Sequence, residues 1–279
     1  MSDLQHHILL GPEHLTGNGG LGRYVFLPGD RSRAASIAAS FEDHEVVENP
    51  RGLTAHLGRL VVGGASVDAL SISSGMGTAS TEIVLHELIA AGARRVVRVG
   101  SCGALDPNLR PGQVAILSGA VRDEMASRHI APVEFPAVSH PTAVHSMVLG
   151  ARAAGVGEEA FLGIGHTKAS LYAREFGHGP RGEENRAYGH LLSRCGAIAS
   201  DMEAALLFIR ASAASAGSAS TVGAGNAVVP VQAACVLGVY GGDDSDMRLD
   251  PALCRLADQR AIAVASHGIM AWARADGVL

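Results

Sequence analysis

Arg98 is the residue whose surroundings most clearly predict chemistry. It lies in an apolar run, Arg94–Ala104, that predicts a buried strand followed at once by a glycine-rich exit. A permanently charged guanidinium at the end of a buried strand is costly unless an anion meets it. Small residues such as Ser101 follow directly, so backbone N–H groups can approach the same anion. We predict half of an oxyanion site here, most simply a site for phosphate.

Two other segments have a similar construction, in which a strand ends, glycine turns the chain and a helix begins. The first is Leu27–Arg33, where Arg33 falls in the first helical turn and helix N–H groups attract anions. A surface arginine beside an Asp30 helix cap is the alternative. The second is Ser73–Glu82, for which a tight strand-to-helix turn is the alternative. Three such strand ends together favour one crevice at the C-terminal edge of a sheet.

A pair of carboxylates, Asp201 and Glu203, is placed at the start of an apolar helix. One carboxylate there is ordinary, because it complements the helix dipole. A second one flanked by Met202 and Ala204 could instead accept two hydroxyl hydrogen bonds, as the cis-diol of a ribose offers. Helix capping and diol binding both remain open from the residues alone.

Other catalytic signatures are missing from the sequence. The 13 histidines show no zinc-site spacing, and no serine–histidine–aspartate order stands out. The Walker phosphate loop and the Rossmann dinucleotide fingerprint are also missing. We therefore predict neither a metal site nor an organic cofactor.

The elements that must position these residues alternate between strands and helices, which favours an α/β fold with a largely buried sheet. Short runs rich in Val, Ile and Leu and bounded by glycine predict seven strands. They are Tyr24–Pro28, Arg59–Val62, Ser66–Ser73, Arg95–Ser101, Gln113–Gly119, Ala160–His166 and Ala233–Tyr240. Helices are predicted over Arg31–Phe41, Ser80–Ala91, Thr142–Ala154, Glu183–Arg194, Asp201–Ser215 and Ala252–Arg274.

Length and composition limit the remaining possibilities. A chain of 279 residues without a clear linker is expected to form a single domain, residues 1–279. An Ala/Ser/Gly-rich insertion at about residues 211–230 reads either as a flexible loop or as an active-site flap. The net charge of −5 gives no general attraction to nucleic acid. With no long apolar run and a polar N-terminus, we expect no membrane contact and a cytoplasmic protein.

Several motifs, in their order along the chain, resemble the hexameric nucleoside phosphorylase family, most closely its uridine phosphorylase branch. The resemblance covers roughly residues 6–210 and resumes near residue 233. The matching segments are Pro28–Asp30 with Arg33, Arg51, Ser73–Glu82, Arg98–Ala104, Ala120–Glu124, Glu134–Val138, Leu171–Phe176 and Ser200–Ala204.

The resemblance implies a three-layer α/β/α sandwich around a twisted mixed sheet, assembled as dimers into a homohexamer. It implies phosphorolysis, in which a nucleoside and inorganic phosphate, the co-substrate, give a free base and ribose 1-phosphate. Arg98 and Glu203 would be the catalytic residues. By resemblance, phosphate would be held by Gly29, Arg33, Arg51, Arg98 and Ser101, ribose by His7, Met202 and Glu203, and the base by Cys102, Gly103, Lys168 and Tyr172. Arg51 and His7 would serve a neighbouring subunit.

The base is the part of the substrate that the sequence determines least. The glutamine and arginine with which many uridine phosphorylases read uracil have no counterpart in Leu171–Gly177. Lys168 could donate to a base carbonyl, and a surface lysine is the alternative. Asp243 or Asp244 could assist a leaving purine, as an aspartate does in purine-specific relatives, although acidic turn residues explain both equally simply.

We therefore expect phosphorolysis of a pyrimidine nucleoside, with uridine as the first choice. A purine nucleoside phosphorylase is the alternative within the same chemistry. A hydrolytic nucleosidase is disfavoured because water needs no cluster of arginines. A non-catalytic nucleoside-binding paralogue remains the other alternative, and the insertion at about residues 211–230 is what keeps it open.

Overall fold

The computed structural model describes residues 4–216, 229–242 and 249–279. In this part of the chain, ten strands form one mixed sheet in the order β10-β6-β8-β9-β5-β1-β4-β3-β2, with β7 paired to β6. The strands are β1 Tyr24–Phe26, β2 Phe41–Val47, β3 Ala55–Val62, β4 Ala65–Ile72, β5 Arg95–Ala104, β6 Val114–Asp123, β7 Ala137–Val138, β8 Ala160–Lys168, β9 Ala197–Asp201 and β10 Gln232–Gly242. The predicted α/β fold with a mixed sheet is confirmed.

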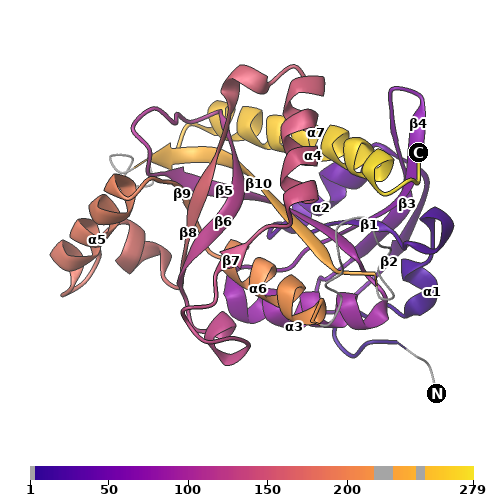
Figure 1. Cartoon of the computed structure of the whole chain (residues 1–279), viewed down its shortest axis with the longest axis horizontal. Coiled ribbons are helices and arrows are strands. Elements are labelled where there is room, and N and C mark those ends of the chain that lie inside the picture. Colours follow the sequence, from indigo (N-terminus) through magenta and orange to yellow (C-terminus); the bar gives the residue numbers. More distant parts are fainter. Residues whose placement is uncertain (1–3, 217–228, 243–248) are drawn as a thin grey trace.

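Helices α2, α3, α4, α6 and α7 fall into two groups, each with its own apolar cluster, and α5 lies apart at one end of the molecule (Figure 1). Helices α3 and α6 share one cluster with strand residues such as Val25 and Val96. Helices α2, α4 and α7 share the second cluster with Phe26 and Val97. The helices are α1 Pro12–Leu15, α2 Arg31–Ala38, α3 Gly77–Ala91, α4 Pro141–Ala153, α5 Gly182–Arg194, α6 Ala204–Ala214 and α7 Pro251–Ala275.

Strand β5 is the strand on which the site is built, and its sequence explains its place. Residues 95–100 are all buried, so the run reads as a strand covered on both faces. It pairs in parallel with β1 and with β10, and in antiparallel with β9. Since β10 also pairs with β6, this part of the sheet closes on itself. The C-terminal ends of β1, β5 and β10 therefore meet at one edge.

The packing of α4 on α7 depends on two glycines that face each other. A Cβ added at Gly150 would overlap the backbone of Val264 and Gly268, and one added at Gly268 would meet Met147 at 2.7 Å. Removing both Cβ atoms lets the two helix backbones approach closely. The buried indole of Trp272 then donates from Nε1 to Gln232 Oε1 at 3.0 Å, which joins α7 to the start of β10.

The remaining differences from the sequence prediction have local causes. Strand β2 was not predicted because its sequence is charged and only Phe41 in it is buried, as expected of an edge strand. Strand β9 was not predicted, and Asp201 is its last residue rather than the first of a helix. The helix begins at Ala204, with Glu203 at its N-cap. Within residues 4–216, 229–242 and 249–279, no helix combines the length and the apolar character needed to cross a membrane.

Candidate active site

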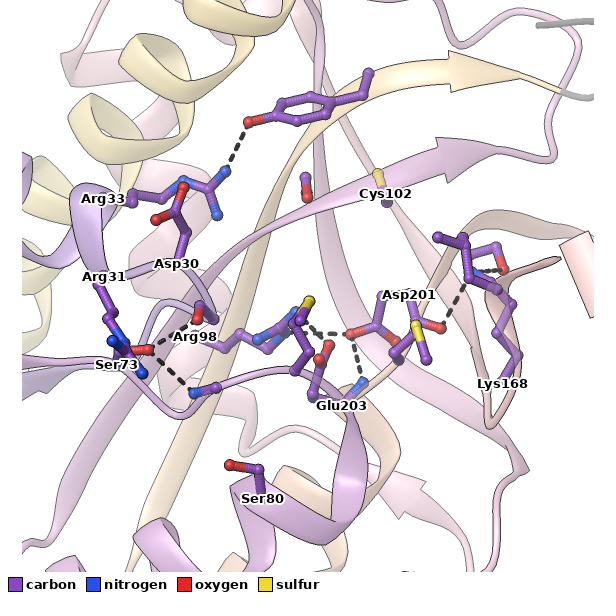
Figure 2. Close-up of a pocket in the computed structure, with 18 of the residues that line it drawn as sticks. Asp30, Arg31, Arg33, Ser73, Ser80, Arg98, Cys102, Lys168, Asp201 and Glu203 are labelled. Atoms are coloured by element: carbon purple, nitrogen blue, oxygen red, sulfur yellow. Dashed lines mark hydrogen bonds and ion pairs between the residues drawn. The ribbon is translucent and has the colours of Figure 1, made fainter. Parts of the chain in front are cut away.

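A cavity of about 850 Å³ opens at the edge of the sheet where β1, β4, β5 and β10 end. Figure 2 shows Arg33 and Arg98 at one part of it and Lys168 at the other, with Glu203 and Asp201 between them. The structure thus brings together residues predicted from separate strand ends. The predicted residues that line the cavity are His7, Gly29, Arg33, Arg51, Arg98, Ser101, Cys102, Gly103, Lys168, Met202 and Glu203.

Arg98 lies at the centre of the cavity wall and directs its three guanidinium nitrogens to different targets. Its Nε donates to Asp201 Oδ2 at 3.2 Å, and its Nη2 donates to Glu203 Oε2. Its Nη1 is buried and has no hydrogen-bond partner among the described residues. That nitrogen lies next to Gly29, since a Cβ added there would be 3.8 Å from it. This nitrogen and the Gly29 turn mark the point at which the sequence predicts an anion, and binding there stays a prediction.

The charge of Arg98 is maintained by its neighbours. Burial alone would lower the pKa of this guanidinium, but Glu203 and Asp201 outweigh burial and raise it above its ordinary value. The Asp201 side chain is fully buried, and it also accepts from Thr167 Oγ1 at 2.7 Å. A buried charge needs such paired and hydrogen-bonded partners. Arg98 is therefore a fixed cation with one donor that the described residues leave without a partner.

Arg33 supplies a second cation from the first turn of α2. Asp30 caps this helix by accepting from the backbone N–H of Ser32 at 2.7 Å, as the capping alternative expected. Arg33 is nevertheless buried rather than exposed, and its Nη2 donates to Tyr240 Oη at 2.7 Å and to Asp258 Oδ1 at 2.8 Å. Its buried Nε has no partner among the described residues. A capped helix and a buried arginine therefore coexist in this segment, and anion binding by Arg33 stays a prediction.

Tyr240 and Asp258 hold Arg33 in place. Burial raises the pKa of Tyr240, and its hydrogen bond to Asp258 raises it further against the opposing effect of Arg33. The phenol therefore stays protonated, donating to Asp258 at 2.8 Å while it accepts from Arg33. Neither residue was predicted from the sequence.

The two carboxylates at the end of β9 have different roles. Asp201 Oδ2 accepts from the backbone N–H groups of Glu203 and Ala204 at 3.1 and 2.9 Å, so Asp201 caps the helix and binds Arg98. Glu203 Oε1 accepts from the N–H of Gly77 at 2.6 Å, at the start of α3. Each carboxylate oxygen can accept more than one hydrogen bond, so Glu203 keeps capacity for hydroxyl groups. Diol binding by Glu203 stays a prediction.

His7 and Arg51 lie on the rim of the cavity of their own chain. His7 Nδ1 is 2.6 Å from Glu87 Oε1, and the backbone N–H groups of His7 and Ile8 donate to Glu87 Oε2 at 2.9 Å each. Burial alone would raise the pKa of Glu87, but these hydrogen bonds outweigh it and the pKa is lowered. Glu87 thus anchors the segment that carries His7. That His7 or Arg51 contributes to the site of a neighbouring subunit stays a prediction.

The end of the cavity around Lys168 departs from the sequence prediction at Tyr172. The Tyr172 side chain is 56% exposed, stacks against His178 and does not line the cavity. The physical reason is a π-helical turn over residues 171–175, which directs Leu171 and Glu175 inward instead. Lys168 is only 2% exposed, which rejects the surface-lysine alternative.

Glu175 is an acidic residue of this cavity that was not predicted as a site residue. Its Oε2 is 2.5 Å from Lys168 Nζ. Cys102, also at this end, is buried, and burial raises the pKa of its thiol, so it stays protonated. Asp243, Asp244 and residues 217–228 of the Ala/Ser/Gly-rich insertion lie outside the described residues.

Two comparisons with known proteins, one with family models and one with curated sequences, point to the same family. The model of the phosphorylase superfamily matches residues 23–233. A protein named uridine phosphorylase from Treponema pallidum is 35% identical over 209 residues, which are 75% of this chain and 76% of that protein. Uridine phosphorylases from Haemophilus influenzae and Thermococcus kodakarensis are each 32% identical, over 53% and 61% of this chain. The chain spans only 56% and 57% of the length of those two relatives.

Proposed function

Because this chain belongs to the phosphorylase superfamily, we propose that it is a pentosyltransferase acting on a pyrimidine nucleoside. The reaction is uridine plus inorganic phosphate giving uracil plus ribose 1-phosphate, as the names of the relatives suggest. The observation that carries the proposal is the arrangement of Arg98. Two of its nitrogens bind Asp201 and Glu203, and the third, beside the Gly29 turn, has no hydrogen-bond partner in the described part of the chain.

In this proposal phosphate binds among Gly29, Arg33, Arg98 and Ser101, below the sugar. The bond between the anomeric carbon and the base breaks, its electron pair leaves with the base, and a phosphate oxygen bonds to the same carbon. The transition state has oxocarbenium character, as in glycoside hydrolysis, so a dianion below the ring stabilises it. The base anion takes up a proton to give uracil. The protein contributes mainly orientation and fixed charge.

The remaining parts of the site follow the same scheme. Glu203 accepts hydrogen bonds from the 2′ and 3′ hydroxyls, and Met202 packs on the sugar. His7 and Arg51 serve the site of a neighbouring subunit, so a dimer is the active unit and a homohexamer the assembly. Phosphate is the co-substrate, and the reaction as written uses neither a metal nor an organic cofactor.

We further propose that residues 1–279 act as one nucleoside phosphorylase-like domain, a three-layer α/β/α sandwich, in cytoplasmic pyrimidine salvage. The separate apolar clusters of α3 and α6 and of α2, α4 and α7 support the layering. Nucleic acid and membranes are not partners in this scheme.

A panel of uridine, thymidine, inosine and adenosine, each with and without phosphate, tests the function by measuring release of free base. We expect uracil release from uridine that depends on phosphate. Preferential cleavage of inosine or adenosine would support a purine nucleoside phosphorylase instead. Equal release without phosphate would indicate a hydrolytic nucleosidase. Binding of uridine without any cleavage would indicate a non-catalytic protein.

A further inference from the structure

A buried ion pair lines the end of the cavity away from Arg33. Lys168 Nζ and Glu175 Oε2 are 2.5 Å apart, and their side chains are only 2% and 13% exposed. A buried ion pair is often no more stabilising than apolar residues of similar volume, because both charges must leave water. The fold alone therefore does not account for these two residues, and both line the cavity.

A chain of hydrogen bonds fixes the position of the Lys168 ammonium. Nζ donates to Ser200 Oγ at 2.9 Å, and Ser200 Oγ is 3.3 Å from His166 Nδ1. His166 Nε2 is in turn 2.9 Å from Asp123 Oδ2. With the hydrogen of a neutral His166 on Nε2, every donor points the same way, from Lys168 through Ser200 and His166 to Asp123. Lys168 is thus a pre-positioned donor rather than a mobile chain.

Glu175 reaches the cavity because residue 103 is glycine. A Cβ added at Gly103 would overlap Glu175 Oε1, so the carboxylate rests in the space that a side chain there would fill. Leu171 and Phe176, from the same turn and the residue after it, supply apolar wall beside it. The result is one fixed acceptor beside one fixed donor in a partly apolar recess.

We propose that the Lys168–Glu175 pair is the base-reading element and that it selects a base whose ring N–H lies next to a carbonyl group. The Glu175 carboxylate accepts from the ring N–H, and the Lys168 ammonium donates to the adjacent carbonyl oxygen. Uracil presents this edge as N3–H between two carbonyl groups. This inference rests on the proposed function, and it names the feature of the substrate that the site distinguishes.

The direct test compares uridine with 3-methyluridine in phosphate-dependent base release. Methylation of N3 removes the donor and places a methyl group against the carboxylate, and sites built to bind a polar hydrogen reject such analogues strongly. We expect the wild-type protein to prefer uridine by about 10³-fold in kcat/KM. In the double variant Lys168→Met/Glu175→Leu, both charges are removed together, and the preference should fall to about tenfold or less, mainly through loss of activity on uridine.

Matched variants separate base reading from general damage. Arg95→Met/Asp276→Leu removes another buried ion pair, joined at 2.7 Å but outside the cavity, and should keep the wild-type preference. Gly103→Ala retains both charges of the Lys168–Glu175 pair but displaces the Glu175 carboxylate, so it should also narrow the preference. It provides a second measurement should the double variant fail to fold.

His166 tests the positioning chain. His166→Leu removes the acceptor for Ser200 and should narrow the preference for uridine, whereas His166→Gln retains an acceptor and should restore much of it. If His166 had a purely structural role, its replacement would lower kcat/KM for uridine and 3-methyluridine by the same factor and leave their ratio unchanged.

The two proposals fail in different ways. If the wild-type protein releases no base from any nucleoside with phosphate, the proposed function is wrong. If it cleaves uridine but accepts 3-methyluridine equally, or if the double variant and Gly103→Ala keep the wild-type ratio, only the base-reading inference is overturned.

Discussion

Replacement of Arg98 by lysine tests whether the three-way geometry of this residue, rather than its charge alone, makes the site. The guanidinium donates to Asp201 at 3.2 Å and to Glu203, and its Nη1, beside Gly29, has no partner among the residues that the structure describes. A lysine offers one nitrogen on a shorter side chain, so it can serve only one of these directions well. We expect the lysine ammonium to bind the buried carboxylates of Asp201 and Glu203, so no donor remains for phosphate.

The expected size of the effect follows from what is removed. Loss of one preorganised hydrogen-bond donor that stabilises charge in the transition state costs about 3 kcal/mol, which is about 10² to 10³-fold in rate. We expect this loss in kcat/KM for phosphate, measured with uridine held at saturation. Stability should fall less than in Arg98→Met, because the methionine leaves two buried carboxylates unpaired, which typically costs about 3–5 kcal/mol.

Arg95→Lys is the matched control for this prediction. Arg95 lies on the same strand and is equally buried, and its Nε and Nη2 donate to Asp276 at 2.9 and 2.7 Å outside the cavity. It should lose stability without a change in phosphate dependence. A folded Arg98→Lys protein whose kcat/KM for phosphate stays within about threefold of the wild type would refute the reasoning, since a lost donor predicts far more.

Three further predictions concern groups around the site. Tyr240→Phe removes one acceptor that holds Arg33, so the KM for phosphate should rise about 3- to 10-fold in steady-state assays; an unchanged KM would mean that Asp258 alone positions Arg33. The pKa of Glu87 is lowered in the folded state, so its stabilising effect should be present above its ordinary value of 4.5 and disappear as pH falls through the folded value. Denaturant titrations should therefore show Glu87→Gln less stable than wild type at pH 7, with a gap that narrows below pH 4.5; a gap independent of pH would contradict this. Burial raises the pKa of Cys102, while Cys195 is exposed, so mass spectrometry after alkylation of the native protein should find Cys195 modified first, and early modification of Cys102 would show that the cavity opens.

The parts of the site that the sequence predicts are those encoded by short segments. Gly29, Arg98 and Ser101 lie at strand ends whose apolar runs and glycines are visible within ten residues. Their convergence follows from the rule that parallel strands present their C-terminal ends at one edge. Glu203 and His7 both line this cavity of their own chain, whereas the family resemblance assigned His7 to the site of a neighbouring subunit.

The residues that were not predicted act across long separations in sequence. Asp258 is 225 residues from Arg33, and Glu87 is 80 residues from His7. No local pattern marks either one as a partner, because an acidic residue on a helix is ordinary. Tyr172 was predicted at the site but does not line the cavity, and Glu175 lines it without having been predicted. The reason is a π-helical turn, which changes which side chains point inward.

The ion pair between Arg98 and Glu203 has a thermodynamic consequence for the proposed reaction. In the proposed complex Arg98 would bind phosphate and Glu203 would bind the ribose, and the two side chains are hydrogen-bonded to each other. A change in the hydrogen bonding of the guanidinium on phosphate binding would therefore alter the carboxylate that binds the ribose. Occupancy of either half of the site must then change the affinity of the other half, and by linkage the factor is the same in both directions. A thermodynamic cycle built from calorimetric titrations, each half filled in the presence and absence of the other, would give that factor, and removing the pair should bring it toward unity.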